Sequence, residues 1–388
     1  MIKLADNTIG KDDINALIKW LNQDPVPILT KNKLTLNLEK EWVDIIGTKY
    51  SVYVNSGSSA ILLLLAALKV QKKYNNQIIV PALSWITDVS SPMFMGFTPV
   101  LCDCNLTDLS CDLNYLEDLF KKYGNKRQST LFISVAPLGL VPRIDDILIL
   151  CDIYNITLIE DNCESMGSKY KGQMLGGFGL ASCFSMYYGH HISSIEGGLI
   201  NTNDDDLYNL LLSIRSHGWS RDLPAEEQER LRQDWNTNEF NELYTFYYPG
   251  LNLRSTDLQA FIALRQINKL HGYCQARNKN FMLYNNLLKD HNKLNLYIND
   301  NDFISNFAYP MVHENKKQII NELRKNNIEV RPLIAGNIGN QPFWINEYGY
   351  QSLKNADIID KYGFYLPNHQ NLKEEDINFI YNVIKNHI

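Results

Sequence analysis

The sequence predicts an α/β protein with a mostly parallel central sheet, helices on both faces of that sheet, and a smaller C-terminal α+β region. Two patterns indicate this fold class. Short apolar runs alternate with helical patterns over the first two thirds of the chain, and such alternation favours parallel strands joined by helices. From about Ser255 the alternation gives way to one long helical pattern followed by short strands. A length of 388 residues also fits more than one domain.

The individual elements follow from the spacing of apolar residues. Ile14, Leu17 and Leu21 recur at helical spacing, and residues 60–73 form a buried helical pattern after a small polar run. The expected strands are Gln77–Val80, Pro99–Cys102, Leu131–Val135, Thr157–Glu160, Ser182–Met186 and Gly198–Asn201. Further helical patterns lie near Leu113–Lys121, Ile144–Tyr154 and Asp205–Arg215.

The C-terminal third predicts a separate unit. A helical pattern runs from Leu258 to Leu270, and strands are expected near Phe307–Val312 and Ile328–Val330. We therefore expect a large domain over residues 1–254 and a small C-terminal domain over residues 255–388.

Composition and charge argue against several classes of protein. The formal net charge of −6 disfavours non-specific binding to nucleic acid or to an anionic membrane. The first residues lack the apolar core of a secretory signal, and the longest apolar run, Ala60–Leu68, is far shorter than the roughly 20 residues that span a bilayer. We therefore expect a cytoplasmic protein that binds neither nucleic acid nor a membrane.

The seven cysteines indicate reduced thiols. Cys102, Cys104 and Cys111 form a C-x-C-x6-C cluster, but this cluster lacks the usual C-x2-C spacing of metal and iron–sulfur sites. An odd number of cysteines fits no paired disulfide framework. Buried thiols are the simpler interpretation, and we expect no metal.

Two motifs lie where ligands bind in parallel sheets, at the carboxyl ends of strands. The run Ser56-Gly57-Ser58-Ser59-Ala60 opens a helix, and free backbone amides at a helix N-terminus bind phosphate. The second motif, with Asp161 and Glu164, directly follows an apolar strand, where a carboxylate can keep a pyridine nitrogen protonated. Each motif alone also fits an ordinary helix start or helix cap.

A third segment, Phe184 to Gly198, makes the order of motifs recognisable. Together with Pro81 to Trp85, Pro249 to Arg254 and Arg331-Pro332, it resembles the DegT/DnrJ/EryC1/StrS group of sugar aminotransferases. That group belongs to the fold-type I class of enzymes that depend on pyridoxal 5′-phosphate (PLP). The resemblance extends over nearly the whole chain and implies the fold-type I architecture.

The chain departs from that group at one position. In the group, a lysine lies six residues after the Phe of a Phe-Ser pair and six before the Glu of Glu-Gly-Gly. Counting from Phe184 and from Glu196 gives His190 both times. Imidazole cannot form the internal aldimine that an aminotransferase needs, but it still moves protons near neutral pH. The neighbouring His191 is expected to face away from His190 in extended backbone.

A histidine at this position is typical of the sugar 3-dehydratase branch of the group. The resemblance implies removal of the C3 hydroxyl from a nucleotide-linked 4-keto-6-deoxy sugar, carried by GDP, with L-glutamate as amino donor and release of ammonia. It implies PLP or its amine form (PMP) bound non-covalently, without an internal aldimine, and His190 as the catalytic acid/base. It also implies a homodimer with shared active sites and no reductase partner.

The same resemblance implies roles for single residues. Trp85 is expected to stack on the cofactor ring and Asp161 to pair with the ring nitrogen, whereas Asn252 would reach the phosphate in the neighbouring subunit. The expected cofactor-binding residues are Gly57, Ser58, Trp85, Asp161, Glu164, Ser185 and Asn252, and the expected substrate-binding residues are His217, Arg221 and Arg331. The last three also fit ordinary surface side chains.

Several alternatives stay open at this point. A GDP-4-keto-6-deoxy-heptose presents the same C3–C4 chemistry, and Gly189 stands where the branch suggests serine. A catalytically silent PLP- or PMP-binding protein would also lack the lysine. An aminotransferase would need Lys169 or Lys171 at the site. A CDP-sugar dehydrase with an iron–sulfur cluster would need a cysteine well before Cys102, and none precedes it.

Overall fold

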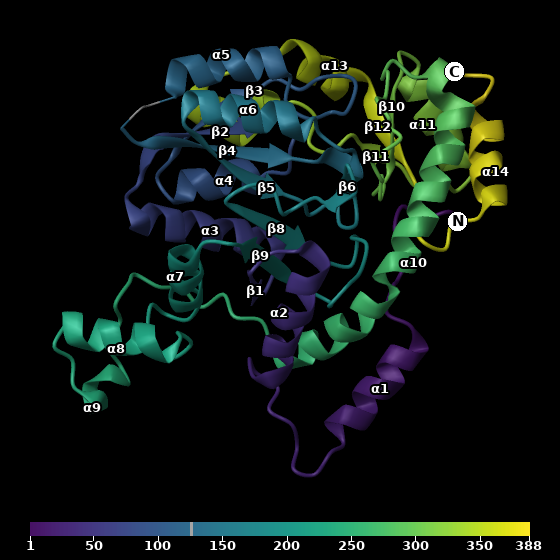
Figure 1. Ribbon diagram of the computed structural model, residues 1–388. Coiled ribbons are helices and arrows are strands. Elements are labelled where there is room, and N and C mark those ends of the chain that lie inside the picture. The colour runs from purple at the N-terminus through teal and green to yellow at the C-terminus, as the bar shows by residue number, and fades with distance from the viewer. Residues whose placement is uncertain (125–126) are drawn as a thin grey trace.

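The computed structural model describes residues 1–124 and 127–388, and a seven-stranded sheet lies at its centre (Figure 1). The strand order is β1-β9-β8-β5-β4-β2-β3, and only β9 runs antiparallel to its neighbours. The strands are β1 (Tyr50–Val54), β2 (Tyr74–Pro81), β3 (Thr98–Cys102), β4 (Ser129–Val135), β5 (Ile156–Asp161), β8 (Ala181–Ser185) and β9 (Gly198–Thr202). The predicted mostly parallel sheet is confirmed.

Helices cover both faces of this sheet because its strands alternate two apolar sets. Ile133 and Ile159 join the core beneath α3, whereas Phe132 and Leu158 join the core beneath α5 and α6. One face carries α3 (Gly57–Gln71), α4 (Thr87–Phe94) and α7 (Asp205–Arg215). The other carries α2 (Lys33–Ile46), α5 (Leu113–Tyr123) and α6 (Ile144–Tyr154). The fold class expected from the sequence is therefore correct.

Side chains at the helix starts explain several boundaries. Ser56, Asp112 and Asp204 cap α3, α5 and α7 by accepting a hydrogen bond from the backbone amide three residues further on. The bounds of α6 and α7 match the helical patterns in the sequence, and β1 is the strand of the central sheet that the patterns did not predict. The remaining elements of this part are α1 (Lys11–Leu21), η1 (Pro137–Gly139), β6 (Lys169–Tyr170), β7 (Gln173–Met174), α8 (Ala225–Asp234) and α9 (Glu239–Glu242).

The C-terminal part begins with one long helix and contains a small antiparallel sheet of order β10-β12-β11. Helix α10 (Asp257–Leu288) extends far beyond the predicted pattern and packs against α2 at one end and α14 at the other (Figure 1). The other elements are η2 (Lys289–His291), β10 (Tyr309–Val312), α11 (Lys316–Lys325), β11 (Arg331–Pro332), η3 (Ile338–Asn340), α12 (Pro342–Tyr348), α13 (Lys354–Tyr362), β12 (Gly363–Leu366) and α14 (Glu374–Ile384). The domain boundary between residues 254 and 255 stays a prediction. Among the described residues, no helix combines the length and apolarity needed to cross a membrane.

A buried guanidinium joins α10 to the segments that flank the small sheet. Arg277 is 1% exposed, and its Nη1 donates hydrogen bonds to the carbonyl oxygens of Asn368 at 2.6 Å and Phe307 at 3.0 Å. The Asn368 side chain donates in return to the Arg277 carbonyl oxygen at 3.0 Å. Burial lowers the pKa of Arg277 to about 10, so the side chain stays charged at neutral pH. The cation is thus held by backbone carbonyl oxygens.

We predict that Arg277→Met lowers the free energy of unfolding by roughly 2–5 kcal/mol, because it leaves buried carbonyl oxygens without a donor. Urea unfolding followed by circular dichroism measures this change. Arg324→Met, on the exposed side of α11, is the matched control and should change stability by no more than about 0.5 kcal/mol. Equal effects of the two substitutions would contradict the bracing role of Arg277.

Candidate active site

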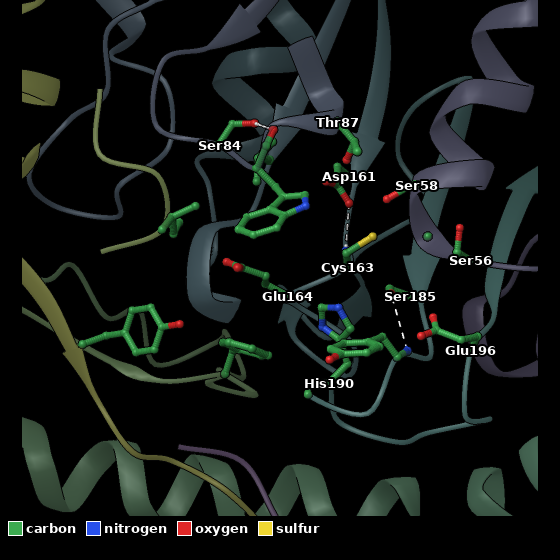
Figure 2. Close-up of a pocket in the computed structure, with 18 residues that line it drawn as sticks. Ser56, Ser58, Ser84, Thr87, Asp161, Cys163, Glu164, Ser185, His190 and Glu196 are labelled. Carbon is green, nitrogen blue, oxygen red and sulfur yellow. Dashed lines mark hydrogen bonds between the residues drawn. The ribbon is translucent and has the colours of Figure 1, made fainter. Parts of the chain in front are cut away.

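A cavity of about 470 Å³ opens at the carboxyl ends of β4, β5 and β8, where a parallel sheet binds its ligands. Figure 2 shows His190, Asp161 and Ser58 lining this cavity from three different elements. The lining residues are Ser56, Gly57, Ser58, Ser84, Trp85, Thr87, Val135, Asp161, Cys163, Glu164, Ser185, Tyr187, Gly189, His190, Glu196, Phe307, Ile334 and Tyr365. Six of the seven expected cofactor residues and the expected catalytic residue therefore meet in one place.

The N-terminus of α3 forms the end of the cavity that suits a phosphate. Ser56 accepts a hydrogen bond from the Ser59 amide at 3.1 Å, which leaves the first-turn amides of Gly57 and Ser58 for an anion. A Cβ on Gly57 would lie 2.7 Å from the Cβ of Ser185, so only glycine lets the helix end approach β8 this closely. The Ser185 hydroxyl lies at the same end of the cavity.

Asp161 supplies the buried carboxylate at the end of β5. Its side chain is 6% exposed, and its Oδ1 accepts a hydrogen bond from the Cys163 amide at 2.9 Å (Figure 2). Burial raises the pKa of this carboxyl group, and the hydrogen bonds from Cys163 oppose that shift. A buried anion at this point fits a ligand that carries a protonated ring nitrogen.

His190 lies on the loop after β8 and forms part of the cavity wall. Its imidazole packs against the Phe307 ring with centroids 5.5 Å apart, and its backbone amide donates to the Tyr187 carbonyl oxygen at 3.0 Å. Burial, helped by the positive charge of Arg277, lowers the pKa of His190 to about 4. The imidazole is therefore neutral at pH 7 and ready to accept a proton.

The adjacent histidine has different surroundings. His191 is fully buried and does not line the cavity; its Nε2 lies 2.9 Å from the carbonyl oxygen of Ser305, to which it donates. Burial and the charge of Arg277 lower the pKa of His191 well below its ordinary value. Its place in the fold is that of a packed core histidine.

Two further side chains complete the walls of the cavity. Glu164 Oε2 accepts a hydrogen bond from the Leu138 amide at 2.9 Å, and burial raises the pKa of this carboxyl group to about 7. Leu138 adopts a φ of 53°, which turns the chain so that its amide meets this carboxylate. Trp85 remains 57% exposed at the cavity, so its indole face is free for a flat ligand.

Four expected residues do not line this cavity. Asn252 is exposed and pairs with Ser216 in an isolated bridge, which places it in a separate region near α7. His217 and Arg221 lie in that same region around the Trp219 ring, with Arg221 Cζ 4.1 Å from the ring centroid. Arg331 forms an ion pair with Glu329 at 2.5 Å and lies opposite Tyr365, a lining residue.

Several lining residues had no signal in the sequence. Phe307, Ile334 and Tyr365 come from the C-terminal part, and only tertiary packing brings them to the sheet. Two other lining residues had only an indirect signal. Ser84 lies within the Pro81 to Trp85 motif and Thr87 lies two residues after it, so that motif was the one sequence feature that pointed to them.

The residues present fit a phosphate-bearing pyridine cofactor. The crowded approach of Gly57 to Ser185 builds a cradle of backbone amides, Asp161 provides a buried anion, and Trp85 offers an open aromatic face. No lysine is among the lining residues that the structure describes. These residues would hold the phosphate, the ring nitrogen and the ring face of PLP.

Several known proteins resemble this chain in both sequence and fold. The chain is 30% identical to GDP-4-keto-6-deoxy-D-mannose 3-dehydratase of Yersinia pseudotuberculosis over 98% of both chains. It is 31% identical to the protein of the same name from Escherichia coli O55:H7, over 92% of this chain and 93% of that one. A solved structure of GDP-4-keto-6-deoxymannose-3-dehydratase with a trapped PLP-glutamate geminal diamine superposes with a TM-score of 0.87 at 29% identity, over 99% of this chain and 100% of that one.

These matches agree with the resemblance inferred from the sequence motifs. The family model also matches almost end to end, over residues 7–385. On this evidence the chain belongs to the DegT/DnrJ/EryC1/StrS aminotransferase family.

Proposed function

We propose that this chain removes the C3 hydroxyl group of a GDP-linked 4-keto-6-deoxy sugar, using non-covalently bound PLP and PMP, L-glutamate as amino donor and His190 as acid/base. One observation carries the proposal: His190 occupies the wall of the cavity, and none of the described lining residues is a lysine. The enzyme is a PLP-dependent nucleotide-sugar 3-dehydratase. Its relatives from Yersinia pseudotuberculosis and Escherichia coli carry that activity in their names.

The proposed overall reaction balances with glutamate as the reductant. The sugar loses the oxygen at C3, while glutamate becomes 2-oxoglutarate and releases its nitrogen as ammonia. Replacement of the C3–O bond by a C3–H bond is a two-electron reduction of the sugar. The two electrons come from glutamate, which is oxidised to 2-oxoglutarate. When bound, PMP supplies an amino group for the C4 carbonyl carbon and a ring that accepts electrons.

His190 moves the proton in this reaction. Because its pKa is lowered to about 4, the imidazole begins neutral and would first accept a proton from the C4′ methylene carbon of bound PMP. The resulting imidazolium is buried beside Arg277, an unfavourable position, so it readily gives the proton to the departing C3 hydroxyl oxygen. The low pKa thus favours a base that acts first and an acid that acts second.

Asp161 and the start of α3 hold the cofactor in this proposal. The Asp161 carboxylate keeps the ring nitrogen protonated, and the amides of Gly57 and Ser58 with the Ser185 hydroxyl bind the phosphate. Because none of the described lining residues is a lysine, these contacts and the face of Trp85 would have to hold the cofactor without a covalent link from this cavity.

The substrate's diphosphate leads us to propose a shared active site. None of the described lining residues is a lysine or arginine, yet a diphosphate requires cationic partners. Arg221 and Arg254 gather around Trp219 in the separate region, close to the exposed Asn252. We infer that these residues serve the cavity of a second copy in a homodimer.

Specific contacts bear on two alternatives. Lys171 pairs with Asp145 at 2.5 Å in an exposed hairpin, so an aminotransferase using it is disfavoured. A Cβ at Gly189 would meet only the Tyr187 ring, at 3.6 Å, so the glycine leaves open space beside His190. That space favours keeping the GDP-4-keto-6-deoxy-heptose as the second candidate substrate.

We expect the purified protein, given PLP, L-glutamate and GDP-4-keto-6-deoxymannose, to release ammonia and a sugar lighter by one oxygen. His190→Asn should slow this reaction by roughly 10²–10⁴-fold because the acid/base is lost. Mass spectrometry and an ammonia assay measure both products. Lys171→Met is the control and should leave the rate unchanged. If GDP-4-keto-6-deoxymannose stays unchanged but the GDP-4-keto-6-deoxy-heptose is converted, the heptose is the substrate. If a PMP-bound protein converts neither sugar, the result favours a catalytically silent PLP- or PMP-binding protein.

We expect a mixed dimer of His190→Asn and Arg221→Glu chains to recover activity. In a symmetric dimer with shared sites, one of the two sites then has both residues intact, so about half of the wild-type activity returns. Co-expression with two different affinity tags isolates this dimer. Activity no higher than that of the two parental dimers would show that each site uses residues of one chain.

We predict that His190 titrates well below the ordinary histidine pKa of about 6.5. The folded protein resists protonation that the unfolded chain accepts, so this histidine makes the protein less stable as the pH falls from about 6.5 through the folded pKa near 4. NMR of histidine-labelled protein, with His190→Asn to assign the signal, gives the midpoint. A midpoint at or above 6.5 would overturn the base-first order.

A further inference from the structure

A second buried carboxyl group lies behind the cofactor position. Asp88, in the first turn of α4, is fully buried and does not line the cavity. Its Oδ2 accepts a hydrogen bond from the Ser84 hydroxyl at 2.5 Å. Its Oδ1 has no conventional partner among the described residues, although a buried carboxyl oxygen is costly to leave unpaired.

The neighbour of this carboxyl group is Asp161. The two carboxyl groups are close enough to interact, and this contact raises the pKa of Asp88 and lowers the pKa of Asp161. Two carboxylates cannot both stay ionised at such a contact in a buried site, because like charges repel strongly at low dielectric. A single proton shared by the two carboxyl groups removes the repulsion. If that proton is on Oδ1 of Asp88, this otherwise unpaired oxygen becomes a hydrogen-bond donor.

The other titratable groups that surround Asp88 reinforce this arrangement. Glu164 and Asp161 on the segment around the end of β5 and the thiols of Cys163 and Cys183 all interact with it or with its partner. Burial, followed by the charge of Asp161, raises the pKa of Asp88 well above its ordinary value. All of these groups are acids, so the surroundings favour the protonated form of Asp88.

We propose that Asp88 is a positioning residue for the cofactor: held by Ser84, its carboxylic acid donates a hydrogen bond to Asp161 and fixes the Asp161 carboxylate toward the cavity. This inference rests on the proposed function, in which Asp161 pairs with the ring nitrogen. Asp88 keeps one Asp161 oxygen occupied and leaves a single negative charge in the pair. That charge is the counterion for one protonated nitrogen.

A simpler role must be distinguished from this one. An acid in the first turn of a helix can stabilise that helix through its dipole. Such a role would require an ionised Asp88, and its removal would affect stability but not the cofactor site. The structure favours the first role, because the hydrogen-bond donor to Asp88 is the Ser84 side chain and no side-chain cap is formed at the start of α4.

The protonation state can be measured on the protein without cofactor. We expect the infrared spectrum of the wild type minus that of Asp88→Asn to show the C=O band of a protonated carboxylic acid from pH 6 to pH 8. Labelling the aspartate carboxyl groups with ¹³C should shift this band. Absence of the band across this range would mean that both carboxyl groups are ionised, and would overturn the proposal.

The positioning role can be measured by PMP binding, followed by quenching of tryptophan fluorescence. Asp88→Leu has no donor for Asp161 and should weaken PMP binding by about tenfold or more, whereas Asp88→Asn keeps a donor and should stay within about threefold of the wild type. Asp108→Asn removes another buried carboxyl group, outside the cavity, and should leave PMP affinity unchanged.

The outcomes separate this inference from the proposed function. If the wild type binds PMP and Asp88→Leu binds it equally well, the positioning role of Asp88 is wrong while the dehydratase proposal stands. If the wild type fails to bind PMP, the proposed function itself fails. Circular dichroism shows whether Asp88→Leu folds. If it does not, the infrared band and the PMP affinity of Asp88→Asn still test the positioning role. A loss of more than tenfold in the PMP affinity of Asp88→Asn would contradict that role, because this variant keeps a hydrogen-bond donor.

Discussion

The buried guanidinium of Arg277 is the interaction on which the C-terminal half of the site depends. By donating to the carbonyl oxygens of Phe307 and Asn368, it fixes the segment that carries Phe307, and the Phe307 ring packs directly against His190. The same positive charge helps to lower the pKa of His190. One buried cation therefore helps to fix the position of the proposed acid/base and adds to the effect of burial on its pKa. This links the packing of α10 to the chemistry of a cavity built mainly by the central sheet.

The cavity separates its charges between two sides. Asp161, Asp88 and Glu164 lie toward the end of β5, where burial raises the pKa of each carboxyl group. Arg277 lies behind His190, where its charge and burial lower the pKa of the imidazole. A ligand with a protonated ring nitrogen fits the acidic side, and a proton acceptor fits the other. The electrostatics of the fold thus agree with the assignment of roles in the proposed reaction.

How much the sequence could predict depended on the range of the interactions. Six of the seven strands of the central sheet, together with α6 and α7, could be predicted because their apolar spacing is local. Asp161, Ser185 and His190 could be predicted because they lie in motifs at strand ends. The full length of α10 could not be predicted, because its apolar spacing weakens after Leu270 while packing continues to Leu288. The burial of Asp88 and the approach of Phe307 to the cavity also lacked a signal, since tertiary contacts alone produce them.

In the proposed function His190 takes the place of the family's lysine, and this changes what the rest of the site must do. A covalent link holds a cofactor whatever the precision of the other contacts, but a cofactor without that link stays only if its phosphate and ring nitrogen meet preformed partners. The structure has this preorganisation where it is needed: Gly57 has no room for a Cβ beside Ser185, and Asp161 is buried and held by the Cys163 amide. The proposed contact of Asp88 with Asp161 adds to this preorganisation. Because Asp88 holds the Asp161 side chain in place, Asp161 loses less conformational freedom when the ring nitrogen binds.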